Sequence, residues 1–257
     1  MKSIFLLCLL AAVATAQGQD DKHEKHQMKG QHDKHGMHGK YTDFMPMSTL
    51  GLGASFQQFD GLNSRIAGFP EYTSLKDHAA TLQLGWLKER NRFVSGSDIS
   101  FGNSFSGDKG KKSSNIRFIG LGADFGYAVV KNKTVLFYPF AGLGYEWYQA
   151  RFYKDNSSSD FDDVLDSPNL QNAIRPVNFK NDFFTYHLGL GVNLTSPKSM
   201  GGGIGLRAGY TGSFHDSYWK SNDNQNLGNA PKDGLSRFFV SLVFSHQPMM
   251  MGKGKGH

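Results

Sequence analysis

Cysteine is nearly absent from this chain of 257 residues. The one cysteine, Cys8, lies in an N-terminal apolar stretch that we expect to be removed, so the mature chain has no thiol for a disulfide or a thiolate metal site. No stretch reaches the length of about 18 apolar residues that a membrane-spanning helix needs. Hydrophobic residues make up 39% of the chain and the mean hydropathy is −0.44, values that exclude a helical membrane protein.

The first residues have the features of a secretory signal peptide. Lys2 supplies a positive charge, residues 4–13 are apolar, and Ala14, Thr15 and Ala16 form an A-x-A cleavage pattern. We therefore expect residues 1–16 to be cleaved and the protein to be exported.

Glycine and aromatic residues are abundant, with 31 Gly, 21 Phe and 10 Tyr. Eight stretches alternate apolar residues with small or polar ones, which is the pattern of a β-strand with one apolar face. They lie near residues 50–57, 80–86, 93–101, 119–127, 137–147, 184–194, 204–211 and 237–245. The third stretch is the least regular, because Ser95 and Ser97 share a face with Phe93. The pattern predicts an all-β fold of about eight strands, with ten strands as the alternative.

The connections between these stretches alternate in length. Long ones fall at residues 60–76, 103–114, 153–180 and 216–234, and short ones at 88–91, 131–133 and 196–200. Tight periplasmic turns and longer extracellular loops are typical of a bacterial outer-membrane β-barrel. A soluble antiparallel barrel or sandwich shows the same alternation with a period of two. The signal peptide and the alternating lengths of the connections favour the membrane form.

Aromatic residues lie near the ends of these stretches or on their apolar face, as in the aromatic girdles of membrane barrels. They are Trp86, Tyr127, Tyr145, Trp147, Tyr186 and Tyr210. The last stretch, residues 235–244, ends in Phe244. With these features, residues 48–246 resemble the small eight-stranded outer-membrane β-barrel proteins.

That resemblance implies a single antiparallel up-and-down transmembrane β-barrel in the outer membrane of a Gram-negative bacterium, with both termini in the periplasm. It implies two partners, the outer-membrane lipids and the barrel insertion machinery, which reads the aromatic end of the last strand. The chain continues for thirteen residues after Phe244, where the family usually stops.

An eight-stranded barrel leaves a lumen that side chains can fill. The predicted inward face carries four titratable residues, Asp124, Glu146, His187 and Arg207. Because buried opposite charges persist when they are paired, we expect an interior network that joins Glu146 to Arg207. A conducting pore or a proton path is the alternative.

The segment 17–47 and the tail 247–257 are predicted to be flexible and rich in His, Met and Lys. Their candidate metal ligands are His23, His26, Met28, His32, His35, Met37, His38 and His257. Neutral imidazole suits Zn²⁺, Ni²⁺ and Cu²⁺, and thioether sulfur favours Cu(I). We expect weak binding of Cu, Zn or Ni, with no cofactor required by the barrel. Alternatively, these tracts are solvated linkers whose lysines repel cations.

One short motif raises an enzymatic alternative. His215 and Ser217 lie where the seventh strand enters its long loop, and this H-x-S resembles the lipid A deacylases, in which Ser217 would be the nucleophile and His215 the base. Tyr218 stands where that family has Asn. Residues 155–166, rich in Asp, Asn and Ser, could bind Ca²⁺ or a partner, although they lack the spacing of a defined calcium loop.

The remaining evidence concerns partners. The formal net charge is +6, but Arg residues are not interleaved with aromatic residues, so we expect no nucleic-acid partner. Exposed loops on a rigid barrel favour a structural, adhesion or binding role in the envelope, toward an unknown extracellular ligand. A lipid-modifying hydrolase and a metal-capture protein are the alternatives.

Overall fold

The computed structural model describes residues 47–107, 111–132, 134–195 and 202–246. The expected signal peptide, nearly all of the His/Met-rich segment and the C-terminal tail lie outside these residues. So does the short connection expected at 196–200. Of the three helices in the described part of the chain, none is long and apolar enough to cross a membrane.

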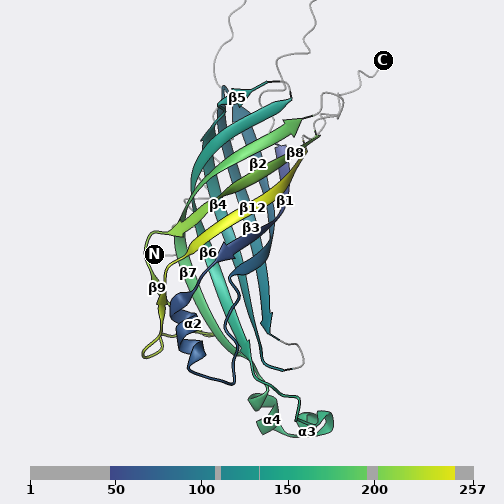
Figure 1. Ribbon diagram of the computed structural model, residues 1–257, viewed down its shortest axis with the longest axis vertical. Coiled ribbons are helices and arrows are strands. Elements are labelled where there is room, and N and C mark those ends of the chain that lie inside the picture. The colour runs from purple at the N-terminus through teal and green to yellow at the C-terminus, as the bar shows by residue number, and fades with distance from the viewer. Residues whose placement is uncertain (1–46, 108–110, 133, 196–201, 247–257) are drawn as a thin grey trace, which may run out of the picture. The chain divides into compact units, whose positions relative to one another are not determined.

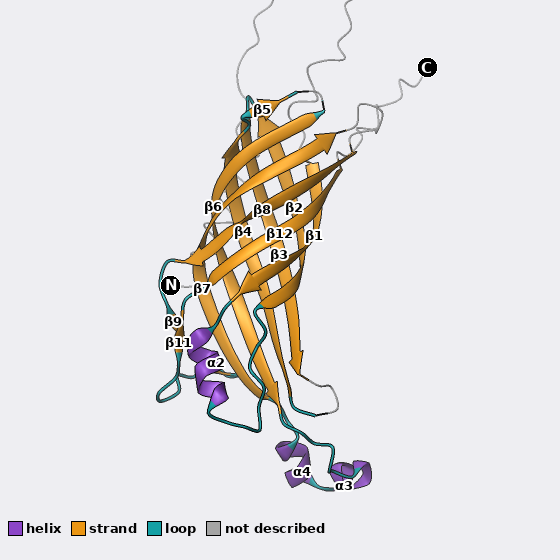
Figure 2. Ribbon diagram, viewed as in Figure 1, coloured by secondary structure: helices purple, strands orange, loops and turns teal. Residues whose placement is uncertain are grey.

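Within the described residues, eight long strands form a closed antiparallel barrel (Figures 1 and 2). Each strand pairs with its neighbours along the chain, and β1 pairs with β12 from Ser48↔His246 to Gln57↔Arg237, which closes the sheet. The barrel strands are β1 (Met47–Gln57), β2 (His78–Arg90), β3 (Phe93–Gly107), β4 (Ser113–Tyr127), β6 (Val135–Tyr153), β7 (Val177–Thr195), β8 (Gly202–Ser213) and β12 (Ser236–His246). This closure confirms the all-β barrel and decides for eight strands rather than ten.

The short elements lie in the connections. They are the helices α2 (Asp60–Ala67), α3 (Phe161–Asp166) and α4 (Pro168–Ala173), and the two-residue strands β5 (Val130–Lys131), β9 (Ser217–Tyr218), β10 (Lys220–Ser221) and β11 (Lys232–Asp233). The turn expected at residues 88–91 joins β2 to β3 through Asn91 and Arg92, with φ of 51° and 73°. Positive φ at both central residues gives a turn whose twist matches that of the two strands.

The apolar face of the barrel points outward. On β1, Leu50, Leu52 and Phe56 are exposed, whereas Ser55 and Gln57 are buried inside. The same alternation continues around the barrel, with exposed outward residues that include Leu82, Leu84, Ile119, Leu143, Leu188, Leu190, Leu206, Phe238 and Leu242. A soluble barrel would bury these side chains, so the arrangement is that of a barrel whose outer surface contacts lipid.

Four strands extend past the others at one end of the barrel. β6 and β7 have 19 residues each, against 11 in β1 and β12, which makes each of them about 26 Å longer as a strand. β3 and β4 have 15 residues each, and β3 runs to Gly107. The long connection expected at 103–114 is therefore mostly strand, because the pairing of β3 with β4 continues to Gly107↔Ser113.

On β6 the alternation of apolar and polar residues reverses in this extension. On β6, Tyr148, Ala150 and Phe152 face inward and are buried, while Gln149 and Arg151 lie on the outer face. The inward residues form an apolar cluster with Phe59, Leu62 and Ile66 from α2 and its N-terminal flank, and with Ile116, Phe118, Phe183, Trp219 and Leu235. The extension is therefore built like a sheet in water, with α2 covering its apolar face.

A buried carboxylate holds this cover in place. Asp233 on β11 accepts hydrogen bonds from the backbone N–H groups of Gly61 (2.7 Å) and Leu62 (3.0 Å), and from the Trp219 indole (2.7 Å). Phe59, the residue at the N-cap of α2, offers no side-chain cap, so Asp233 caps this helix from the other end of the chain. Any side chain at Gly61 would press on Asp233, because a Cβ there would lie 2.8 Å from Oδ1.

We expect Asp233→Ala to release α2 from the extension. The change leaves three buried N–H donors without an acceptor, each at a cost of about 1–3 kcal/mol. Limited proteolysis of the refolded protein should then cleave within residues 58–77, and hydrogen exchange at Gly61 and Leu62 should accelerate. Asp223→Ala removes an exposed aspartate of the same loop and serves as the control; equal protection in both variants would contradict the capping role.

Candidate functional site

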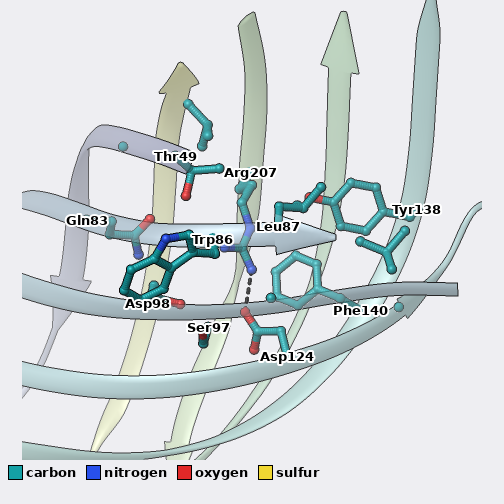
Figure 3. Close-up of a pocket in the computed structure, with 15 residues that line it drawn as sticks. Thr49, Gln83, Trp86, Leu87, Ser97, Asp98, Asp124, Tyr138, Phe140 and Arg207 are labelled. Carbon is teal, nitrogen blue, oxygen red and sulfur yellow. Dashed lines mark hydrogen bonds and ion pairs between the residues drawn. The ribbon is translucent and has the colours of Figure 1, made fainter. Parts of the chain in front are cut away.

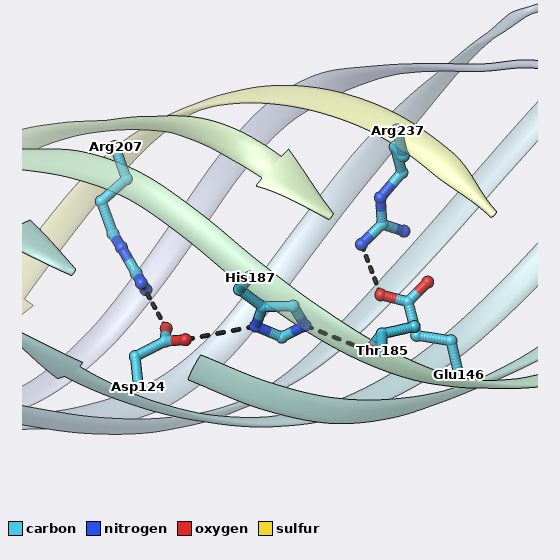
Figure 4. Close-up of polar contacts among 6 residues, drawn as sticks. All are labelled: Asp124, Glu146, Thr185, His187, Arg207 and Arg237. Carbon is cyan, nitrogen blue, oxygen red and sulfur yellow. Dashed lines mark hydrogen bonds and ion pairs between the residues drawn. The ribbon is translucent and has the colours of Figure 1, made fainter. Parts of the chain in front are cut away.

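A charged network crosses the middle of the barrel interior. Asp124 on β4 accepts a hydrogen bond from Arg207 Nη2 on β8 at 2.5 Å, and its other oxygen lies 3.2 Å from His187 Nδ1 on β7. The second ring nitrogen of His187 lies 3.3 Å from the hydroxyl of Thr185 (Figure 4). The Arg207 guanidinium also lies over the ring of Phe140 at 4.4 Å, and Figure 3 shows it pointing toward Asp124. Three strands are thus joined by one carboxylate.

A second ion pair lies nearer the extended end. Glu146 Oε1 on β6 accepts a hydrogen bond from Arg237 Nη2 on β12 at 2.5 Å, and Oε2 accepts one from the Tyr148 hydroxyl at 2.9 Å. Arg237 also donates to the Tyr148 oxygen at 3.1 Å and lies over the Phe118 ring at 4.4 Å. Each interior arginine therefore has one carboxylate and one aromatic ring.

The expected partnership of Glu146 with Arg207 is wrong. In the β4–β6 register Asp124 lies opposite Gly142, so Glu146 is four residues further toward the extended end. Arg207 lies opposite Ser241 in the β8–β12 register, and Arg237 is likewise four residues further along. Each carboxylate therefore forms an ion pair with the arginine that lies at the same height in the barrel. The partner of Glu146 is Arg237, which the prediction omitted.

Asp98 on β3 is a third interior carboxylate, and sequence reasoning missed it. It lines two small cavities, of about 20 Å³ each, that also border Asp124 and Arg207. Space of this size holds about one water molecule and no hydrated solute. His187 fits closely here, because a Cβ at Gly144 would lie 2.8 Å from its Nε2.

Apolar clusters lie on both sides of the charged network. The cluster under α2 occupies the extended end, and a second cluster occupies the end with the short turns. The second comprises Leu87, Val94, Ala128, Tyr138, Phe140 and Phe239, with Met47 and Leu136 packed against it. Side chains thus fill the lumen at three levels, an arrangement that favours a structural interior over the conducting alternative.

The connection between β6 and β7 is largely exposed. It carries α3 and α4, neither of which has a buried residue, and both lie beyond the strand ends (Figures 1 and 2). Asp160 caps α3 by accepting from the Asp162 N–H, and Ser167 caps α4, where Pro168 occupies the first turn. These capping residues stabilise two short helices that bury no residue against the barrel.

This connection combines acidic and apolar side chains at its surface. Five aspartates lie between Lys154 and Arg175, namely Asp155, Asp160, Asp162, Asp163 and Asp166. Hydrogen bonds from Ser157 hold the pKa of Asp155 below its usual value. Phe161 is 75% exposed and Leu165 61% exposed. We call residues 154–175 the acidic loop.

The enzymatic alternative finds no support in the described residues. His215 is exposed, Ser217 is half-buried at the start of β9, and no hydrogen bond joins their side chains in the part of the chain that the structure covers. The predicted metal ligands, from His23 to His38 and His257, lie outside that part. Within it, no three His, Cys, Asp or Glu residues stand close enough to hold a metal ion.

Comparisons with known proteins find likeness in structure only. No family model matches the sequence, and no curated protein matches it. Among solved structures, Ail of Yersinia pestis, in complex with the heparin analogue sucrose octasulfate, is 13% identical (TM-score 0.45; 80% of this chain, 99% of that chain). Neisserial surface protein A is 8% identical (TM-score 0.46; 79% of this chain, 97% of that chain). OprG of Pseudomonas aeruginosa is 13% identical (TM-score 0.41; 80% of this chain, 95% of that chain). Likeness at this level carries no argument about function.

The class of the protein rests on its own geometry. Eight antiparallel strands close on themselves, the outer surface is apolar over the strand centres, and polar side chains fill the interior between two apolar clusters. On β6 the outward apolar residues run from Phe137 to Trp147, ten steps of about 3.3 Å, which at the usual tilt give a band about 25 Å tall. The chain is a small eight-stranded β-barrel with an apolar outer band, which is the fold of the outer-membrane β-barrel proteins.

We expect Arg237→Met to destabilise the barrel strongly, because it leaves the buried Glu146 carboxylate without its cation. Breaking one side of a buried pair costs about 3–5 kcal/mol. The free energy of unfolding of the vesicle-inserted protein in urea measures the loss. Glu146→Gln combined with Arg237→Met removes both charges and should recover most of it. If the single variant unfolds at the wild-type urea concentration, the pair does not stabilise the barrel.

Proposed function

We propose that this protein is a surface-exposed binding module of the cell envelope, in which the barrel is the anchor and the acidic loop is the contact surface. The supporting observation is that α3 and α4 bury no residue of their own while Phe161 and Leu165 are exposed among five aspartates. Exposed apolar residues in a single patch are a common mark of a binding surface.

The rigid extension supports this role. β6 and β7 remain paired to Phe152↔Val177, immediately before the acidic loop, and the buried cluster beneath α2 stiffens their inner face. The loop is therefore presented beyond the ends of the shorter strands on a paired hairpin, which suits contact with a partner outside the membrane. The filled lumen gives no comparable support to a transport role.

The chemistry of the loop defines the partner that it fits. Five carboxylates around two large apolar side chains are complementary to a basic surface that also offers apolar residues. In this proposal the barrel lies in the outer membrane of a Gram-negative bacterium, reached through a cleaved signal peptide. The acidic loop then faces the exterior, and the role is adhesion or ligand binding.

A defined peptide pair tests the proposed surface. The refolded full-length protein is immobilised in neutral detergent, and binding is measured for an amphipathic Lys/Leu peptide and for a Glu/Leu peptide of the same pattern. We expect the basic peptide to bind. Phe161→Ser with Leu165→Ser should weaken that binding by about tenfold or more, because the variant loses two apolar side chains that the bound peptide would bury.

The control removes exposed apolar residues elsewhere on the extracellular connections. Phe69→Ser with Leu227→Ser changes two such residues, 53% and 42% exposed, and should leave the affinity unchanged. Equal binding of both peptides, or equal affinity of both double variants, would contradict the proposal.

Metal capture by the tails stays a prediction from the sequence. The spacing of His23, His26, His32, His35 and His38 favours shared binding of a Cu²⁺, Zn²⁺ or Ni²⁺ ion. Calorimetric titration of each metal into the refolded protein should show micromolar binding that disappears when residues 17–46 and 249–257 are removed. Binding that survives this deletion would place the metal elsewhere.

A further inference from the structure

A group of cations lies on the outer wall of the barrel, on three adjacent strands. Arg117 on β4 is opposite Gln149 on β6, which is opposite Lys180 on β7. Arg151 follows Gln149 by two residues on the same face of β6. Neighbouring strands are about 4.8 Å apart, so the three cationic residues surround Gln149 within roughly 10 Å. We call Arg117, Arg151 and Lys180 the basic belt.

The basic belt begins where the apolar band ends. On the outer face of β4, Ile119 lies two residues from Arg117 on the side of the apolar band. On β6, Trp147 lies two residues from Gln149 on the same side; Ile119 is 49% exposed and Trp147 41% exposed. Exposed aromatic residues at the edge of an apolar band lie at the level of the lipid headgroups. Because the belt residues are on the outer face of the wall, their charges lie beside those headgroups and not at the tips of the loops.

These charges have no acidic partner. In the described part of the chain, none of the three belt residues forms an ion pair. They donate to neutral acceptors instead: Arg117 to Asn115 Oδ1 (2.9 Å), Arg151 to Gln149 Oε1 (2.9 Å) and Lys180 to the Asn222 carbonyl (2.6 Å). The nearby carboxylate of Asp182 is held by Lys220 and by the hydroxyl of Tyr145.

One donor in the belt also lacks any acceptor. Arg151 Nε is buried and has no hydrogen-bond partner among the described residues. The acceptor Asn178 Oδ1, on the residue opposite Arg151 in the β6–β7 register, is likewise buried without a partner among the described residues. An unsatisfied buried donor is costly, so Arg151 keeps hydrogen-bonding capacity that the described residues do not use.

We propose that the basic belt binds a phosphate group of a lipid in the outer leaflet. Guanidinium groups match phosphate oxygens with paired, charge-assisted hydrogen bonds, and Lys180 adds a third cation. A membrane lipid fits better than a free anion because the belt is continuous with the lipid-facing surface at Ile119 and Trp147. One molecule can therefore place its acyl chains on that surface and its phosphate on the belt. This site is separate from the acidic loop.

Two lipids that differ only in phosphate test the site. The refolded protein in neutral detergent is titrated with bisphosphorylated lipid A and with the same lipid after removal of its phosphates, and bound lipid is counted by native mass spectrometry. The wild-type protein should bind the phosphorylated lipid at least about tenfold more tightly, and added NaCl should reduce this preference. Arg117→Gln with Arg151→Gln and Lys180→Gln should abolish it.

A matched variant controls for net charge. Lys76→Gln with Lys111→Gln and Arg65→Gln removes three exposed cations from other connections and should keep the preference. A heat-dependent mobility shift on a gel verifies that both triple variants are folded. The proposal is overturned if the belt variant keeps the preference or the control loses it. It also fails if both lipids bind the wild type equally, or if inorganic phosphate at the same concentration displaces the lipid.

Discussion

The lipid phase cannot form hydrogen bonds with a peptide backbone, and this constraint governs the rest of the molecule. Every strand that crosses the bilayer must pair on both sides, so β1 has to meet β12 and the sheet has to close. Closure assigns each strand residue to the inside or the outside. The inside of an eight-stranded barrel is too narrow for a solute, so charged residues that point inward must neutralise one another. The pairs at Asp124 and Glu146 follow from this requirement.

The sequence predicted much of the fold because lipid enforces a simple alternation. Residues 184–194, for example, alternate without interruption, and the outward residues Leu188, Leu190 and Leu194 are exposed in the structure. The extension was missed because the alternation reverses beyond Trp147, where water surrounds the outer face and α2 covers the inner face. That reversal, visible at residues 147–152, is the sequence signal that marks the edge of the membrane.

The candidate sites were less predictable for physical reasons. Alternation indicates which residues face inward. The height of each residue along the barrel depends on the register between the strands, which alternation does not give. For this reason Glu146 was assigned the wrong arginine. Arg237 shares its face with Ser241 and Ser245, so its inward direction could have been recognised. The basic belt needed the register of three strands, since Arg117 and Lys180 are more than sixty residues apart in the sequence.

The capping of α2 by Asp233 has a consequence for the order of assembly. α2 follows the first barrel strand, while Asp233 immediately precedes the last one. Because its cap comes from the far side of the β1–β12 seam, the helix cannot be secured before the segment that precedes β12 is in position. The covering of the extended end therefore depends on closure of that seam, so an unclosed sheet would leave the apolar cluster beneath α2 open to water.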